Sequence, residues 1–117
     1  KRKDFIRIGG WDENFWMYYE DMDICKRAKK HGIATKFYND LYCYHFHGKS
    51  SRIDLETKIK SKYQVIKSSF IFIKKHYHGL HGIALYFLLR LSILIELFLL
   101  SPFLKEKRGI LNKILGF

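Results

Sequence analysis

The chain has 117 residues, of which 48% are hydrophobic, and its 22 lysines and arginines against 11 aspartates and glutamates give a net charge of +11 at pH 7. This length suffices for one domain or less. The chain opens with KRKDFIRIGG rather than with an apolar run, so we predict no signal peptide there. The missing initial methionine also indicates a piece of a longer protein.

The positive charge belongs to the second half of the chain. Residues 1–56 carry eleven basic and nine acidic residues, whereas residues 57–117 carry eleven basic residues and only Glu96 and Glu106. That half is also rich in Leu, Ile and Phe, which predicts an anionic membrane surface as partner. A nucleic acid is the alternative for a basic chain, but we find no zinc-finger spacing, RNA-binding sheet signature or basic leucine-zipper heptads. We therefore predict no nucleic-acid partner.

Aromatic residues gather directly after a glycine pair near the start of the chain. Lys1–Ile8 has few apolar positions and is predicted to be a strand end or loop, and Gly9-Gly10 predicts a turn. Five aromatic residues then lie within Trp11–Tyr19, around Asp12. Such a segment forms either a hydrophobic plug beneath a loop or a platform on which a sugar or lipid-linked acceptor rests. Composition leaves both interpretations open.

A helix is predicted from about Tyr19 to a stop at Gly32. Its first turn holds carboxylates, which complement the positive end of the helix dipole, and its later turns hold bases. Asp23 and Arg27 form a favourable i,i+4 pair. A carboxylate at a helix start is usually a cap or a dipole partner, so Glu20, Asp21 and Asp23 each have that structural reading as well as a chemical one.

Two short β segments are predicted next, over Ile33–Tyr38 and over Leu41–Phe46, around the turn signal Asn39-Asp40. The second would place His45 and His47 on one face of a strand. From Asp54 the apolar residues recur every three or four positions as far as Tyr77, which predicts an amphipathic helix with lysines on its other face.

The segment Ile83–Leu104 is long and apolar enough to cross a bilayer, which takes roughly 20 residues. However, Arg90 and Glu96 would each cost about 2.5–3.5 kcal/mol near the centre of a spanning helix, and basic residues flank both ends. Three interpretations stay open: a helix in the plane of the membrane or a shallow hairpin, a helix packed within protein, and a true span.

The segment GGWDENFWMYYEDMDICKRAKKHG, followed by YHFHGKSS, resembles the second half of the catalytic domain of glycosyltransferase family 2, in the branch with bacterial rhamnosyltransferase-like enzymes. In that family a glycine pair, an aromatic, Asp-Glu, further aromatics and Glu-Asp-x-Asp-x-x-x-Arg recur in this order, before a strand that leads to His. The resemblance covers about residues 8–51. More loosely, SKYQVIKSSFIFIKKHYHG resembles the helix that follows in this branch.

The resemblance implies a role for each matching residue. Asp21 would be the general base that takes the proton of the acceptor hydroxyl in an inverting transfer, with Glu20 contacting the acceptor or orienting the site. Trp11 and Asp12 would bind the acceptor, and Asp23 and Arg27 would support the motif. His45 would join the metal and diphosphate site. His47 fits less well, and a plain strand or loop histidine is the alternative.

The resemblance also implies a fold and partners. The fold class would be α/β: the C-terminal part of a GT-A nucleotide-sugar transferase domain over residues 1–53, then a helical, basic, membrane-associating extension over 54–117. The donor would be a nucleotide-sugar and the acceptor a glycan or lipid-linked sugar. A divalent metal (Mg or Mn) would be the cofactor, with its main ligands outside this chain. We accordingly predict that the chain alone is inactive.

The parent enzyme would act at the cytoplasmic face of the cell membrane, as a peripheral or monotopic protein. The competing hypothesis is a non-catalytic, basic membrane-binding module. It predicts that the acidic cluster can be altered without loss of function, and that residues 57–117 bind anionic vesicles in a salt-sensitive way.

Overall fold

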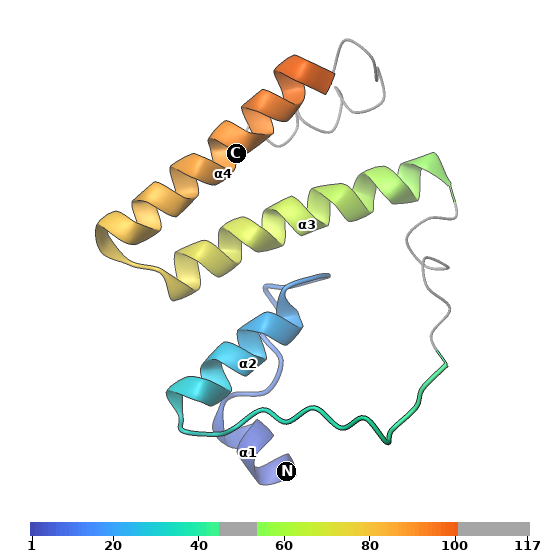
Figure 1. Ribbon diagram of the computed structural model, residues 1–117, viewed down its shortest axis with the longest axis vertical. Helices are drawn as coiled ribbons and strands as arrows, with labels where there is room; N and C mark the ends of the chain where they lie inside the picture. Colours follow the sequence, from blue (N-terminus) through green and yellow to red (C-terminus); the bar gives the residue numbers. More distant parts are fainter. Residues whose placement is uncertain (45–53, 101–117) are drawn as a thin grey trace.

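The structure is a computed structural model that describes residues 1–44 and 54–100, and this part of the chain forms four helices. They are α1 (Arg2–Arg7), α2 (Glu20–Lys30), α3 (Leu55–His76) and α4 (Gly79–Leu100). Figure 1 shows α3 and α4 as a long antiparallel pair, with the shorter α2 beside the C-terminal end of α3. Helix α2 and the loop before it are therefore held against the end of α3.

The predicted α/β fold is wrong for the described residues, which contain helices and no strand. Residues 33–44, which cover the first predicted β segment and most of the second, run on without regular structure. Their side chains lie in water: Phe37, Tyr42 and Tyr44 are 91, 92 and 100% exposed. Alternating apolar residues make a strand only when a neighbouring strand accepts their hydrogen bonds, and the described chain supplies none here.

The start of the chain also differs from its prediction as a strand end or loop, because Arg2–Arg7 forms helix α1. Local charges favour this short helix. Asp4 lies in its first turn and Arg7 lies in its last turn, where each complements the helix dipole. The guanidinium of Arg7 donates a hydrogen bond of 3.0 Å to the carbonyl of His31, which ties α1 to the end of α2.

The helices α2 and α3 confirm the sequence interpretation. Helix α2 begins at Glu20 and ends at Lys30, and Gly32 follows with a φ of +69° that glycine adopts without strain. Helix α3 begins after Asp54, whose carboxylate accepts a hydrogen bond of 2.7 Å from the amide of Thr57. Both helices have local start signals that require no distant partner.

Helix α4 packs antiparallel to α3 around Ile93, which is buried among Tyr63, Ile66, Phe70 and Leu89. Lys62 of α3 and Glu96 of α4 lie 3.7 Å apart, so one of the two charges in the apolar segment faces a base on the neighbouring helix. Over Gly79–Glu96, α4 is long and apolar enough to cross a membrane by length and composition, with a mean hydropathy of 1.5. Residues 101–104 of the predicted segment lie outside the described residues.

The turn between α3 and α4 needs a glycine at position 82. A Cβ atom built there would lie 2.4 Å from the carbonyl oxygen of Tyr77, which is closer than any side chain can approach. The missing side chain lets the first turn of α4 lie directly against the end of α3. Gly82 therefore sets how tightly the two helices are joined.

Candidate functional site

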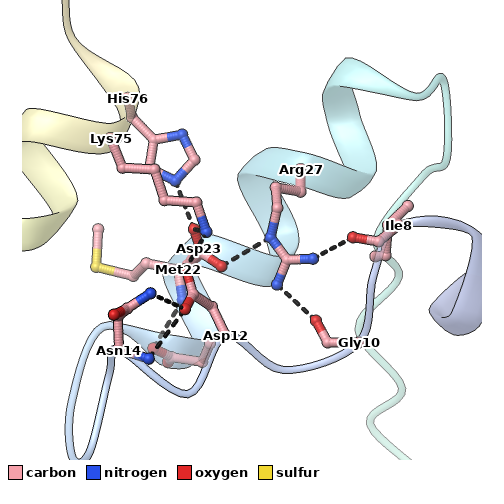
Figure 2. A network of polar contacts seen from close by, with 10 residues as sticks. Ile8, Gly10, Asp12, Asn14, Met22, Asp23, Arg27, Lys75 and His76 are labelled. Carbon is pink, nitrogen blue, oxygen red and sulfur yellow. Dashed lines mark hydrogen bonds and ion pairs between the residues drawn. The ribbon is translucent and has the colours of Figure 1, made fainter.

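A buried carboxylate, Asp23 of α2, forms the centre of a polar network that joins three segments (Figure 2). Its side chain is fully buried. It accepts hydrogen bonds of 2.7 Å from Arg27 Nε, 2.8 Å from Lys75 Nζ and 2.7 Å from His76 Nε2. The predicted Asp23–Arg27 pair is thus confirmed, and α3 contributes two further donors.

The network extends from Asp23 into the glycine turn through Arg27. The guanidinium of Arg27 donates a hydrogen bond of 2.6 Å to the carbonyl of Gly10 and another to the carbonyl of Ile8. Gly10 has a φ of +65°, and a Cβ there would press on the ring of Phe5 at 3.3 Å. The conformation of the turn directs the carbonyls of Ile8 and Gly10 toward the guanidinium of Arg27. The planar guanidinium can donate a hydrogen bond to each of them.

The predicted acceptor loop is held to α3 by Lys75 (Figure 2). Its ammonium group bridges the carboxylates of Asp12 and Asp23. Asp12 also accepts hydrogen bonds of 2.9 and 2.7 Å from the backbone and side-chain amides of Asn14, which shape the loop locally. Farther along the loop, buried Ser68 of α3 donates a hydrogen bond of 2.8 Å to the carbonyl of Met17.

Charges in this network keep both carboxylates ionised. Burial alone would raise the pKa of Asp23, but hydrogen bonds from Lys75, His76 and Arg27 outweigh it and lower that pKa. The hydrogen bond from Lys75 lowers the pKa of Asp12 to about 2. For Lys75 itself, burial acts to lower the pKa, but the two carboxylates raise it above its ordinary value.

His76 takes part in the network as a neutral ring. Burial lowers its pKa, the nearby Lys26 and Lys30 lower it further, and the Asp23 carboxylate opposes this shift without reversing it. A neutral imidazole has one N–H, and Asp23 can only accept, so the hydrogen lies on Nε2. The buried Nδ1 atom is then an acceptor, and no residue of the described chain donates to it.

The predicted catalytic acids lie just outside this network. Asp21 is exposed, and its carboxylate accepts a hydrogen bond of 2.8 Å from the amide of Met22. Glu20 is half-buried, and its Oε2 atom is buried without a hydrogen-bond donor among the described residues. The network thus holds the helix turn that carries both acids, but contacts neither of them.

The backbone is strained immediately before these acids. Tyr18 and Tyr19 have φ values of 68° and 69°, in the left-handed region that residues with a side chain rarely adopt. Tyr19 is also the N-cap of α2, and its side chain makes no capping hydrogen bond. Strain of this kind persists only where surrounding contacts impose it, and here the ring of Tyr19 packs on Phe72 of α3 at 5.4 Å.

The aromatic loop combines the two interpretations that composition left open. Phe15 is 6% exposed and fills the space beneath the loop, whereas Trp11 and Trp16 are 56 and 69% exposed. Trp11 also meets Phe5 edge to face at 5.8 Å. Phe15 therefore forms the hydrophobic plug, and the indoles of Trp11 and Trp16 are exposed at the surface, where a ligand could contact them.

The predicted metal residue, His45, and its neighbour His47 lie outside the described residues. Within residues 1–44 and 54–100, no group of three His, Cys, Asp or Glu side chains could hold a metal ion. Asp12, Asp23 and Lys75 lie together, but the ammonium occupies the place a cation would need. The structure thus gives the metal proposal no ligand set.

Sequence reasoning missed Lys75 and His76 as part of this site. They lie in the run IKKHYHG, where lysines and histidines read as the polar end of an amphipathic helix. Asp23 was assigned to motif support and lies at the centre instead. A buried carboxylate requires cationic or N–H partners, but no pattern in the sequence marks Asp23 as buried, so these partners had no local signal.

Comparison with known proteins finds a similarity to glycosyltransferases in the first part of the chain. Residues 1–49 match the family described as the N-terminal domain of galactosyltransferase. Rhamnosyltransferase WbbL of Escherichia coli (strain K12) is 33% identical over 43 residues, which are 37% of this chain and 16% of that protein. No solved structure matches the chain. The resemblance to glycosyltransferases is confirmed over this segment, and the assignment to family 2 is only loosely supported.

Proposed function

We propose, from the likeness of residues 1–49 to glycosyltransferases, that this chain forms the acceptor side of an inverting glycosyltransferase. The proposed reaction moves a sugar from a nucleotide-sugar donor to a polysaccharide or lipid-linked acceptor. One observation supports it most: the Asp23 network fixes the loop that carries Trp11 and Asp12 against the helix turn that carries Glu20 and Asp21. Transfer is proposed for the full-length protein, because the chain spans 16% of the relative that it matches.

Asp21 suits the part of general base. Its carboxylate is exposed and accepts one amide hydrogen bond, so its second oxygen is open to an acceptor hydroxyl. In the proposed step this oxygen takes the hydroxyl proton while the hydroxyl oxygen attacks the anomeric carbon and the nucleotide leaves. Glu20 would orient the acceptor, and the exposed face of Trp11 would stack on a pyranose ring.

The divalent metal and the nucleotide site remain predictions that rest on the family resemblance. Positive charge on the departing diphosphate is the chemistry that a metal would supply. Because the described residues offer no ligand set, no step proposed here passes through that ion. The residues proposed above act only on the acceptor.

We also propose that the protein works at an anionic membrane surface, on the cytoplasmic face, as a peripheral or monotopic protein. The observation in favour is α4, whose side chains are mostly exposed although the helix is strongly apolar. The net charge of residues 57–117 adds attraction to anionic lipids. A non-catalytic membrane-binding module is the second candidate, because these features require no catalysis.

Substituting Asp21 by Asn in the full-length protein tests the reaction. We expect sugar transfer to fall by roughly 10²- to 10⁴-fold while donor binding and thermal stability stay unchanged. The matched control is Asp40→Asn, which makes the same change at an exposed aspartate in the irregular segment 33–44, outside the proposed site. Unchanged turnover in Asp21→Asn would remove Asp21 as base, and retained biological function without any transfer activity would favour the membrane-binding module.

A further inference from the structure

A long apolar groove lies between α3 and α4, on the side of the turn that joins them. It has a volume of about 660 Å³, within the range of pockets that bind small ligands. Its walls are aliphatic and aromatic side chains, among them Phe70 and Ile73 of α3 and Ile83 and Phe87 of α4. Ile83 and Phe87 are 54 and 66% exposed, so the apolar walls lie open to solvent.

The charged groups that line this groove are all positive. Lys67 and Lys74 stand two helical turns apart on α3, and no Asp or Glu of the described chain lines the groove with them. Both lysines are exposed, and neither makes a hydrogen bond or ion pair with another described residue. Lys75 differs from them, because its ammonium group forms ion pairs with the carboxylates of Asp12 and Asp23.

The turn fixes the end of the groove. Tyr77 and Gly79 close it, and the close approach of Gly82 to the Tyr77 carbonyl holds the helices together there. At its other end the Ile93 cluster joins α3 to α4. The groove therefore lies between two places at which α3 and α4 contact each other.

We propose that this groove binds one hydrocarbon chain of an anionic membrane phospholipid, whose phosphate lies against Lys67 and Lys74. An apolar groove lined by two lysines complements an amphiphile of negative charge. The apolar surface of α4 would then continue from the groove into the lipid layer. This inference extends the proposed membrane association and does not depend on sugar transfer.

The test uses the full chain and a short-chain phosphatidylglycerol below its critical micelle concentration, so that no membrane is present. Binding is followed by calorimetry. We expect saturable binding of one lipid, roughly ten-fold tighter than that of phosphatidylcholine of the same chain length. Lengthening each chain by two methylenes tightens the Kd roughly ten-fold if one chain enters the groove.

Matched variants locate the site. Ile83→Trp fills the groove at a half-exposed position that a larger side chain can occupy without unfolding the helix, and it abolishes binding. Lys67→Gln with Lys74→Gln removes the preference for phosphatidylglycerol. The control Lys3→Gln with Lys58→Gln removes the same charge from exposed lysines away from the groove, and it binds as the wild type does.

Three outcomes would overturn the inference. Equal weakening by the control pair would show a general charge effect, and undiminished binding in Ile83→Trp would place the lipid elsewhere. Tight binding of a short prenyl diphosphate without any binding of phosphatidylglycerol would assign the groove to a lipid-linked acceptor instead. None of these results bears on the Asp21→Asn assay, so the two proposals fail separately.

Discussion

Nε2 of His76 donates a 2.7 Å hydrogen bond to Asp23, a residue 53 positions earlier in the chain (Figure 2). Both side chains are buried, at 0 and 8% exposure for Asp23 and His76. The bond joins the family-matching segment to the end of α3, so the geometry of the candidate site depends on residues outside that segment.

Substituting Asp23 by Asn should destabilise the full chain by about 3 kcal/mol, because Arg27, Lys75 and His76 lose a buried anionic partner. Asp21→Asn removes an acid from the same helix turn, but that acid is exposed, so its effect on stability should stay within about 0.5 kcal/mol. Urea unfolding measures both free energies. Similar losses in the two variants would contradict a central role for Asp23.

The lowered pKa of His76 gives the protein a sensitivity to mild acid. The unfolded chain protonates this ring near pH 6.5, whereas the folded chain does so only at lower pH. The contribution to stability is therefore complete above about pH 6.5 and is lost as the pH falls through the folded pKa.

His76→Gln keeps an N–H donor for Asp23 but does not titrate. We expect the free energy of unfolding to fall more between pH 7 and pH 5 for the wild type than for this variant. All other groups are the same in both proteins, so their contributions cancel in the difference. Parallel pH curves would show that His76 is not buried as a neutral ring.

Lys75 should control the pKa of Asp12. Its hydrogen bond is the largest cause of the low value of about 2, so Lys75→Gln should return the pKa of Asp12 toward 3.8. Carboxyl-detected NMR titration of the full chain measures this value directly. Lys74→Gln is the control, since this neighbour makes no contact with Asp12, and it should leave the value near 2. An unchanged value in Lys75→Gln would mean that the two groups are apart in solution.

Tyr18 should reverse the usual ranking of alanine and glycine. Outside special positions glycine is less stable than alanine by roughly 0.5–1 kcal/mol. At a φ of 68° alanine is strained by roughly 1–2 kcal/mol, and glycine is not. We therefore expect Tyr18→Gly to be more stable than Tyr18→Ala in thermal unfolding. The opposite order would show that Tyr18 does not hold a left-handed conformation in solution.

The sequence was sufficient for α2 and α3 because their signals are local. Asp54 caps α3 through Thr57, and the carboxylates of the first turn of α2 complement its dipole. Over the described residues 33–44, the predicted strands are absent for the opposite reason. Alternating apolar residues indicate that one face of a strand could be buried. They do not indicate whether the protein supplies a partner strand for its backbone hydrogen bonds.

The candidate site was predictable only where its residues lie close in sequence. The pair Asp23–Arg27 follows from i,i+4 spacing, and it was predicted. Asp12 lies 63 positions before its partner Lys75, and Asp23 lies more than 50 positions before it. No local pattern in the sequence reveals contacts over such separations. They also cross the predicted boundary at residue 53, which remains a prediction.

The position of Arg27 has a consequence for the order in which the chain acquires its structure during translation. Its guanidinium can bind the carbonyls of Ile8 and Gly10 as soon as residues 1–27 are made. Asp23 also needs the donors of Lys75 and His76, which the ribosome adds about fifty residues later. Until those donors emerge, a bare carboxylate remains in the nascent polypeptide and favours hydration over burial. Asp23 can therefore be buried with its partners only after residues 75 and 76 have been made.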